Sequence, residues 1–246
     1  MQIEALWRYP LKGMAGESCS FFDLAPNMGI PGDRQFALMR ADRPFADIAQ
    51  WAPKRHFMHG MYTTLLSQIT IRWQTDAVRF EYGDEALELP RPLDQTTALC
   101  DWLAHLDSSL PQLSLVNHVR GWADVSQPVW SMINPSTVQA IADATGTPFS
   151  MARYRGNAWL NQVAPFEELN WVGRIIECGA VRCRVVEPIV RCKATEVNWL
   201  GSRDLGFLDQ LETISPDLVC GIYLETLSSG RLHLGDSISI GSVPTD

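Results

Sequence analysis

Short apolar runs, many of them alternating with polar residues, dominate the pattern of the chain. The first run covers residues 2–11, and further runs rich in β-branched and aromatic residues follow it. Alternation with a period of two is typical of strands that bury one face. The pattern therefore predicts strands at residues 2–11, 18–24, 34–39, 68–73, 78–82, 157–162, 173–178, 181–186, 221–226 and 232–240.

Helices are fewer. Asn134 is suited to cap a helix, Pro135 fits its first position and Gly146 fits its end, so a helix is predicted between them. A second is predicted at 98–106, and 200–216 is expected to be helical or irregular. This balance predicts a mainly β fold with some α (α+β), barrel-like in architecture, with a domain boundary near residues 90 to 110.

Composition and charge exclude several classes of protein. The chain has 246 residues and a formal net charge of −8, whereas a general nucleic-acid binder needs a basic surface. No apolar run approaches the ~20 residues that span a bilayer. The N-terminus carries Glu4 and lacks an apolar signal core. We therefore expect a cytoplasmic protein with no nucleic-acid or membrane partner.

The six cysteines, at positions 19, 100, 178, 183, 192 and 220, show no CxxC spacing. A thioredoxin-like motif or a zinc ribbon is therefore unsupported. Cys178 and Cys183 lie in alternating runs and are expected in the core. Cys192 lies between Arg191 and Lys193, and positive charge favours a thiolate, which is also a soft metal ligand. A structural cysteine beside surface cations explains that local pattern equally well.

A basic stretch interrupts the acidic chain. Residues 151–193 hold seven basic and four acidic side chains. Arg153 and Arg155, followed by Gly156 and Asn157, directly precede an apolar run, and such donors suit a phosphate or a polar ring. For Arg182 and Arg184 the simpler interpretation is a solvated strand face.

These blocks, taken in order, resemble a known family. They are Arg153–Arg155 with Asn157–Leu160, Trp171–Gly173, Val185–Pro188 with Arg191 and Cys192, Gly221–Tyr223, and Gly235–Asp236. The series resembles the MOSC domain of molybdenum cofactor sulfurases and of the mitochondrial amidoxime-reducing component. Tyr9–Gly13 and Gly32–Leu38 resemble the β-barrel domain that precedes it there. The resemblance implies a MOSC domain at 96–246 after a smaller β-barrel-like domain at 1–95.

The resemblance also implies a site for the molybdenum cofactor (Mo-molybdopterin). Cys192 matches the cysteine that binds molybdenum or carries sulfur, and Arg191 precedes it as a second catalytic candidate. The other residues that the resemblance assigns to the cofactor are Lys12, Arg34, Asp124, Ser126, Arg155, Asn157 and Tyr223, together with Arg191. If these assignments hold, Lys12, Arg34 and Arg155 are expected to converge near Cys192.

The chain departs from the family pattern at several positions. Gly13 replaces a serine, Gly156 a proline and Val190 a small hydroxyl residue, and the usual run after Cys192 is altered over residues 193–201. The sequence shows neither a pyridoxal-phosphate domain nor a cysteine-rich ferredoxin segment. We therefore expect an external electron-transfer protein or a cysteine desulfurase as partner, besides a small-molecule substrate.

Three functions remain open from the sequence. The first is an oxidoreductase that reduces N-hydroxylated compounds at molybdenum. The second is a sulfur carrier that uses a Cys192 persulfide. The third is a non-catalytic module that binds a pterin or another anion.

Overall fold

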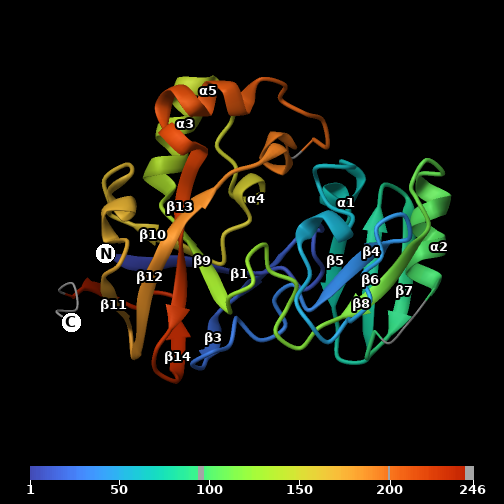
Figure 1. The fold of residues 1–246 in the computed structure, drawn as a ribbon, viewed down its shortest axis with the longest axis horizontal. Helices are drawn as coiled ribbons and strands as arrows, with labels where there is room; N and C mark the ends of the chain where they lie inside the picture. Colours follow the sequence, from blue (N-terminus) through green and yellow to red (C-terminus); the bar gives the residue numbers. More distant parts are fainter. Residues whose placement is uncertain (94–96, 199, 242–246) are drawn as a thin grey trace. The chain divides into compact units, whose positions relative to one another are not determined.

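The computed structural model describes residues 1–93, 97–198 and 200–241 (Figure 1). The first strands are β1 (Gln2–Arg8), β2 (Glu17–Cys19), β3 (Phe21–Leu24), β4 (Phe36–Arg40), β5 (Thr70–Trp73), β6 (Ala77–Tyr82), β7 (Glu85–Pro90) and β8 (Leu113–Asn117). The later strands are β9 (Val129–Ile133), β10 (Ala158–Asn161), β11 (Ile175–Cys178), β12 (Val181–Val190), β13 (Val219–Thr226), β14 (Gly230–His233) and β15 (Ile238–Ile240).

The helices are short. The α-helices are α1 (Leu65–Gln68), α2 (Thr97–Leu106), α3 (Pro135–Thr145), α4 (Met151–Tyr154) and α5 (Phe207–Ile214). The 3-10 helices are η1 (Lys54–His56), η2 (Glu167–Trp171), η3 (Lys193–Glu196) and η4 (Pro216–Leu218). Strand therefore outweighs helix in the described residues, and the predicted mainly β fold with some α is confirmed.

The chain forms two compact units built from interleaved segments. Unit 1 consists of Met1–Arg8, Ser18–Pro31 and Pro128–Asp246, and unit 2 consists of Tyr9–Glu17 and Gly32–Gln127. The interleaving arises because β1 pairs with β10 and β3 pairs with β14. The sequence predicted a sequential division at residue 95 instead, which stays a prediction about the limits of the family domains.

Unit 1 is built on an eight-stranded sheet with the order β15-β11-β12-β13-β9-β10-β1-β2. Strands β9 and β10 run parallel, and the chain between them forms α3 and α4. Parallel neighbours require such a crossover, because the chain has to return to the same end of the sheet. The crossover brings α4 to the ends of the strands that carry the predicted site residues.

The two sides of this sheet approach each other without closing a barrel of named strands. The N–H of Ile3 donates to the carbonyl of Asp236 at 2.9 Å, and the N–H of Gly235 donates to the carbonyl of Ile3 at 2.9 Å. Gln2 also forms a bridge with Ser237. Backbone bonds thus also link β1 to the residues before β15, at the other side of the sheet.

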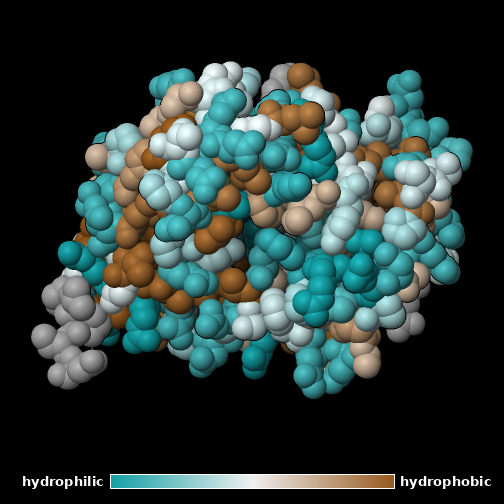
Figure 2. All heavy atoms as spheres, turned by 45° about the horizontal axis from the view of Figure 1, so that its top comes forward, coloured by the Kyte–Doolittle hydropathy of each residue, from teal (hydrophilic) through white to brown (hydrophobic). Residues whose placement is uncertain are grey.

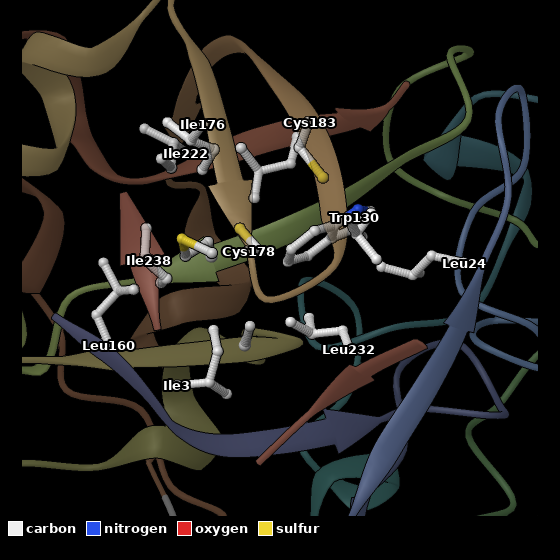
Figure 3. Packing of buried hydrophobic residues seen from close by; sticks show 14 of the residues in the cluster. Ile3, Leu24, Trp130, Leu160, Ile176, Cys178, Cys183, Ile222, Leu232 and Ile238 are labelled. Atoms are coloured by element: carbon white, nitrogen blue, oxygen red, sulfur yellow. The ribbon is translucent and has the colours of Figure 1, made fainter. Parts of the chain in front are cut away.

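A large apolar cluster fills the inner face of unit 1. Figure 3 shows Trp130, Cys178, Cys183, Ile3 and Leu232 within this cluster, from strands far apart in the sequence. Cys178 and Cys183 have no exposed surface, so the expectation that both belong to the core is confirmed.

The opposite face of the sheet packs against helices. Ile133 and Trp159 alternate with residues of the inner cluster and, together with Cys220, form a second core with helix residues of α3 and α5. Figure 1 shows α3 and α5 side by side over this end of unit 1. The helix predicted between Asn134 and Gly146 is present. The Asn134 side chain accepts a hydrogen bond from Ser136 N at 3.0 Å, and Gly146 ends the helix at φ 65°.

Unit 2 has its own core. It contains the antiparallel pair β4-β8 and the antiparallel meander β5-β6-β7. Buried residues of these strands and of α2, among them Leu38, Phe80 and Leu99, form one apolar cluster. The outer surface of the molecule is mixed, and Figure 2 shows hydrophobic groups scattered among hydrophilic ones on one face.

Strand predictions differ from the structure at two instructive places. Strand β9 is absent from the predictions because all five of its residues are buried, so no alternation marks it. The predicted strand at 232–240 is divided into β14 and β15 by a turn in which His233 N donates to Asp236 Oδ2 at 2.7 Å. No helix in the described part of the chain is long and apolar enough to cross a membrane.

Candidate functional site

Cys192 lies directly beyond the end of β12. Arg182 and Arg184 point outward along this strand while Val181, Cys183 and Val185 are buried, which confirms the solvated face expected for the two arginines. Cys192 itself is partly exposed, in extended backbone, and it precedes the first residue of η3. Its carbonyl accepts a hydrogen bond from Thr195 N at 2.7 Å. The strand thus delivers this thiol to an accessible turn.

The two cations beside Cys192 have different environments. Lys193 is exposed, whereas Arg191 is buried and only 8% exposed. Arg191 Nε donates to the carbonyl of Cys220 at 3.0 Å, Nη2 donates to the same oxygen, and Nη1 donates to the carbonyl of Tyr154 at 2.9 Å. The buried guanidinium of Arg191 therefore links the end of β12 to β13 and to the end of α4 by hydrogen bonds.

A buried carboxylate lies on the other side of the same peptide group. Glu168 has no exposed surface, and its carboxylate accepts hydrogen bonds from Asn134 Nδ2 at 2.8 Å, from Thr137 Oγ1 at 2.8 Å and from the N–H of Gly221. Burial raises the pKa of Glu168, and these hydrogen bonds oppose that rise. The Cys220–Gly221 peptide is thus bonded to Arg191 through its oxygen and to Glu168 through its nitrogen.

Gly221 is required where this peptide passes between the two charges. Its φ is +82°, a left-handed conformation, and a Cβ atom there would lie 2.8 Å from the carbonyl oxygen of Met132. Glu168 was not among the predicted site residues. It follows Glu167 between Phe166 and Leu169, and nothing in this local pattern marks one of the two glutamates as buried.

Arg155 and Asn157 frame the start of β10. Arg155 ends α4 in the left-handed region at φ 53°, with its N–H bonded to the carbonyl of Met151 at 3.1 Å. Asn157 is 1% exposed, and its Oδ1 accepts from Ser131 Oγ at 2.8 Å while its Nδ2 donates to the carbonyl of Trp7 at 3.1 Å. Asn157 therefore ties β9, β10 and β1 together.

Gly156 and Tyr223 complete this region. A Cβ atom on Gly156 would overlap Ile133 and lie 3.3 Å from Trp159, so glycine suits the place where the resembling proteins have proline. Tyr223 on β13 pairs with Ser131, the same residue that binds Asn157. Arg155, Asn157, Arg191, Cys192 and Tyr223 thus all belong to unit 1 and are linked through β9, β10, β12 and β13.

The other four predicted cofactor residues belong to unit 2. Lys12 is buried, and its Nζ donates to the carbonyl of Trp122 at 2.8 Å and forms an ion pair with Asp124. Two predicted residues that lie 112 positions apart are therefore in contact. Arg34 forms an ion pair with Asp33 and lies over the ring of Tyr9, at 5.1 Å from its centroid.

The remaining predicted residue of this unit, Ser126, is exposed in a bend. It follows Asp124, whose side chain is 48% exposed. Desolvation opposes ionisation of Asp124, but Lys12, Lys54 and Arg34 hold its pKa well below the usual range.

A buried histidine belongs to the same group in unit 2. Desolvation, together with the nearby Lys12 and Lys54, lowers the pKa of His59 from 6.5 to about 4. The His59 ring makes contacts at both nitrogens: Met61 N donates to Nδ1 at 3.3 Å, and Nε2 lies 3.1 Å from the carbonyl of Lys54. These contacts fit a neutral ring with its proton on Nε2. Nothing in the local sequence marks His59 or Lys54 as members of this group.

Within the described residues, no group of three or more histidine, cysteine, aspartate or glutamate side chains is arranged to hold a metal ion.

Comparisons with known proteins place the domain. No curated protein matches the chain. The crystal structure of YiiM from Geobacillus stearothermophilus is 16% identical, with 46% of this chain and 54% of that chain covered and a TM-score of 0.36. This chain thus spans about half the length of that structure. The crystal structure of the YUAD protein from Bacillus subtilis is 12% identical, with 97% and 94% covered and a TM-score of 0.44.

The family comparison is more specific. Residues 124–239 match the model of the MOSC domain. This range includes Cys192 and all the site residues of unit 1, and it begins at Asp124. The chain therefore carries a MOSC domain, in residues 124–239.

Proposed function

We propose that this protein binds the molybdenum cofactor through its MOSC domain, with the Cys192 thiolate as a ligand of the metal. In this proposal it reduces N-hydroxylated compounds with electrons from a separate protein. The proposal is supported by the domain, since some members of the MOSC family bind this cofactor. It is also supported by the resemblance to the amidoxime-reducing component in the blocks around Cys192.

One observation carries the assignment of the ligand. Four cysteines lie within the matched residues, and three of them, Cys178, Cys183 and Cys220, have no exposed surface. Cys192 is partly exposed and lies beyond the end of a strand. A metal ligand has to be reachable and deprotonated, and a thiolate is a suitable soft donor. Cys192 is the cysteine of this domain that meets the first condition.

The residues around Cys192 fit such a group in part. Arg155 supplies a cation from the end of α4, and Tyr223 supplies a partly buried hydroxyl from β13. Arg191 binds backbone carbonyls, so we expect it to hold the strand end that carries Cys192 rather than to bind the cofactor directly. Lys12, Arg34, Asp124 and Ser126 remain predicted cofactor residues of unit 2.

The chemistry divides between the cofactor and the chain. The molybdenum cofactor supplies the two-electron chemistry when it is bound. The chain holds the thiolate of Cys192 in place through Arg191 and presents it at an accessible turn. No cysteines with the spacing of an iron–sulfur centre occur in the sequence, so the electrons have to come from a partner protein.

Metal analysis of variants tests the ligand. Protein made in a host that synthesises the cofactor is expected to contain molybdenum, and Cys192→Ser is expected to lose it. Cys183→Ser and Cys220→Ser are matched controls that remove buried thiols of the same domain, and they are expected to keep the metal. Full molybdenum in Cys192→Ser protein refutes the assignment.

Turnover tests the reaction. Metal-loaded protein is expected to reduce amidoximes or N-hydroxylated bases with an artificial low-potential donor and to be inactive with NADH alone. Absence of turnover with every such donor rejects the reductase function, even if the metal is bound.

The sulfur carrier is the second candidate, and the environment of Arg191 favours it. Because this guanidinium contacts carbonyls of the protein, one expected donor to a cofactor is already engaged. A carrier needs only an accessible nucleophilic thiol, which Cys192 provides. Incubation with a cysteine desulfurase and cysteine is then expected to add the mass of one sulfur atom to Cys192. The same experiment without that gain, together with loss of molybdenum binding, leaves the non-catalytic anion-binding module.

A further inference from the structure

We infer that Arg153 and Asp204 are positioning residues that fix the loop after Cys192 and, through it, the thiol itself. The Cys192 loop is defined here as the described residues 193–198 and 200–206. The inference rests on the proposed role of Cys192, and it adds residues that the resemblance to the family did not assign. Four observations, taken from Arg153 outward, support it.

Arg153 is a buried arginine at the centre of this region. It lies in α4, and its side chain is only 2% exposed. Its Nη1 donates to the carbonyl of Thr195 at 2.9 Å, and its Nη2 forms an ion pair with Asp204. The guanidinium also lies over the ring of Phe207, the first residue of α5, at 4.7 Å from the centroid. One side chain thus contacts the Cys192 loop near its start, at Thr195, and near its end, at Asp204. The same side chain also contacts the beginning of α5, at Phe207.

The path from Arg153 to Cys192 is short. Thr195 accepts from Arg153 through its carbonyl, and its own N–H donates to the carbonyl of Cys192 at 2.7 Å. Two hydrogen bonds through a single residue therefore connect the guanidinium to the backbone of Cys192. Hydrogen bonds to charged groups contribute more to stability than neutral ones do, so the bond from Arg153 to the carbonyl of Thr195 is the stronger of the two.

Asp204 fixes the returning arm of the loop. Its N–H donates to the carbonyl of Glu196 at 2.9 Å, which brings the two arms together. Its second carboxylate oxygen, Oδ1, accepts from Asn198 Nδ2 at 2.9 Å. Burial opposes ionisation of Asp204, but the bonds from Arg153 and Asn198 lower its pKa. The carboxylate therefore links the buried arginine to the exposed part of the loop.

Asn198 extends the network to the tip. Its Oδ1 accepts from the N–H of Leu200 at 3.0 Å and from the N–H of Ser202 at 3.1 Å. This residue lies in the segment where the sequence departs from the family pattern. The Arg153–Asp204–Asn198 network holds the described residues of the altered segment, 193–198 and 200–201, so the departure does not leave the surroundings of Cys192 without support.

The test compares Cys192 reactivity in purified full-length protein. The variants are Asp204→Asn, Arg153→Lys and the conservative Asp204→Glu. Asp23→Asn is the matched control, because Asp23 forms an ion pair with Arg231 at 2.7 Å in the same unit and on different strands. The probe is iodoacetamide, and peptide mass spectrometry follows alkylation of Cys192 at several pH values.

The expected result is a faster reaction in the positioning variants, because a loop that has lost its anchors opens more often and exposes the thiol. Asp204→Asn and Arg153→Lys are expected to raise the rate at least about threefold. Asp204→Glu is expected to restore most of the native rate, and Asp23→Asn to match the native protein. A lower melting temperature with a native Cys192 rate profile in Asp204→Asn overturns the inference, since that is the outcome of a purely structural ion pair.

A milder variant covers the case in which Asp204→Asn does not fold. Asn198→Ala removes only the partly exposed end of the network and is expected to raise the alkylation rate in the same direction. A native rate in Asn198→Ala then overturns the inference. The experiment needs no cofactor, so wild-type protein that lacks molybdenum contradicts the proposed function and leaves this inference standing.

Discussion

Two buried cations, Arg191 of unit 1 and Lys12 of unit 2, have different partners. Arg191 donates to the carbonyls of Cys220 and Tyr154, which are fixed parts of the backbone. Lys12 donates to the carbonyl of Trp122 and also forms an ion pair with Asp124. A backbone carbonyl cannot leave, whereas the side chain of Asp124 is 48% exposed and is held by its own rotamer alone. Arg191 therefore helps to build the frame of the site, and we predict that Lys12 can exchange the carboxylate of Asp124 for another anion.

The largest effect on stability is expected from removing the guanidinium of Arg191. Arg191→Met leaves the Cys220 and Tyr154 carbonyls without their donors and leaves Glu168 without its opposite charge across the peptide. We expect a loss of about 3–5 kcal/mol in the free energy of unfolding, measured with urea. Arg184→Met is the control, because Arg184 is exposed and lies 3.6 Å from Glu225, and its effect is expected to stay within about 0.5 kcal/mol.

A lower pH is expected to reduce the free energy of unfolding through His59 of unit 2. The pKa of this ring is lowered from 6.5 to about 4, so the unfolded chain takes up a proton before the folded one does. The contribution is fully present above pH 6.5 and is lost as the pH falls towards 4. Between pH 7 and pH 5 we expect a loss of about 2 kcal/mol.

His59→Gln is expected to flatten this dependence in urea unfolding at the two pH values. The control is His105→Gln, which removes an exposed histidine in the last turn of α2 and is expected to keep the native slope. An unchanged slope in the His59 variant shows that other groups cause the acid sensitivity.

The coupling energy between Arg191 and Glu168 tests whether the two side chains act on the same peptide group. Because both bind the Cys220–Gly221 peptide, a double-mutant cycle with Arg191→Lys and Glu168→Gln is expected to give a coupling energy of about 1 kcal/mol or more. Additive effects of the two substitutions contradict a shared role at this peptide.

The smallest effect is expected for the ion pair between Lys12 and Asp124. Asp124→Asn removes a partly exposed carboxylate, so we expect a loss of about 1 kcal/mol or less at low salt. Inorganic phosphate is then expected to raise the melting temperature of the variant more than that of the native protein, because it can replace the missing negative charge beside Lys12. Equal shifts in both proteins show that Lys12 is not open to an external anion.

The sequence predicted features that depend on neighbours along the chain. The helix between Asn134 and Gly146, the outward arginines of β12 and the buried Cys178 and Cys183 all follow from local spacing. The contact between Lys12 and Asp124 was not itself predicted. The resemblance had assigned both residues to the cofactor.

The remaining features depend on contacts between distant segments. The two interleaved units result from pairings such as β3 with β14, and no local pattern reports them. The role of Arg191 at the cofactor stays a prediction, and its bonds to backbone carbonyls were not predictable because they depend on where β13 and α4 lie. Glu168, His59 and Asp204 gave no signal because burial of a single charged residue is decided by the packing around it.

The central claim is that Cys192 is the functional sulfur of the MOSC domain and a ligand of molybdenum. X-ray absorption at the molybdenum edge tests it most directly, on native, Cys183→Ser and Cys192→Ser protein made in a host that synthesises the cofactor. The account predicts the same number of sulfur neighbours around molybdenum in native and Cys183→Ser protein, and either no metal or one sulfur fewer around residual metal in Cys192→Ser protein. An unchanged number of sulfur neighbours in the Cys192→Ser protein contradicts the account.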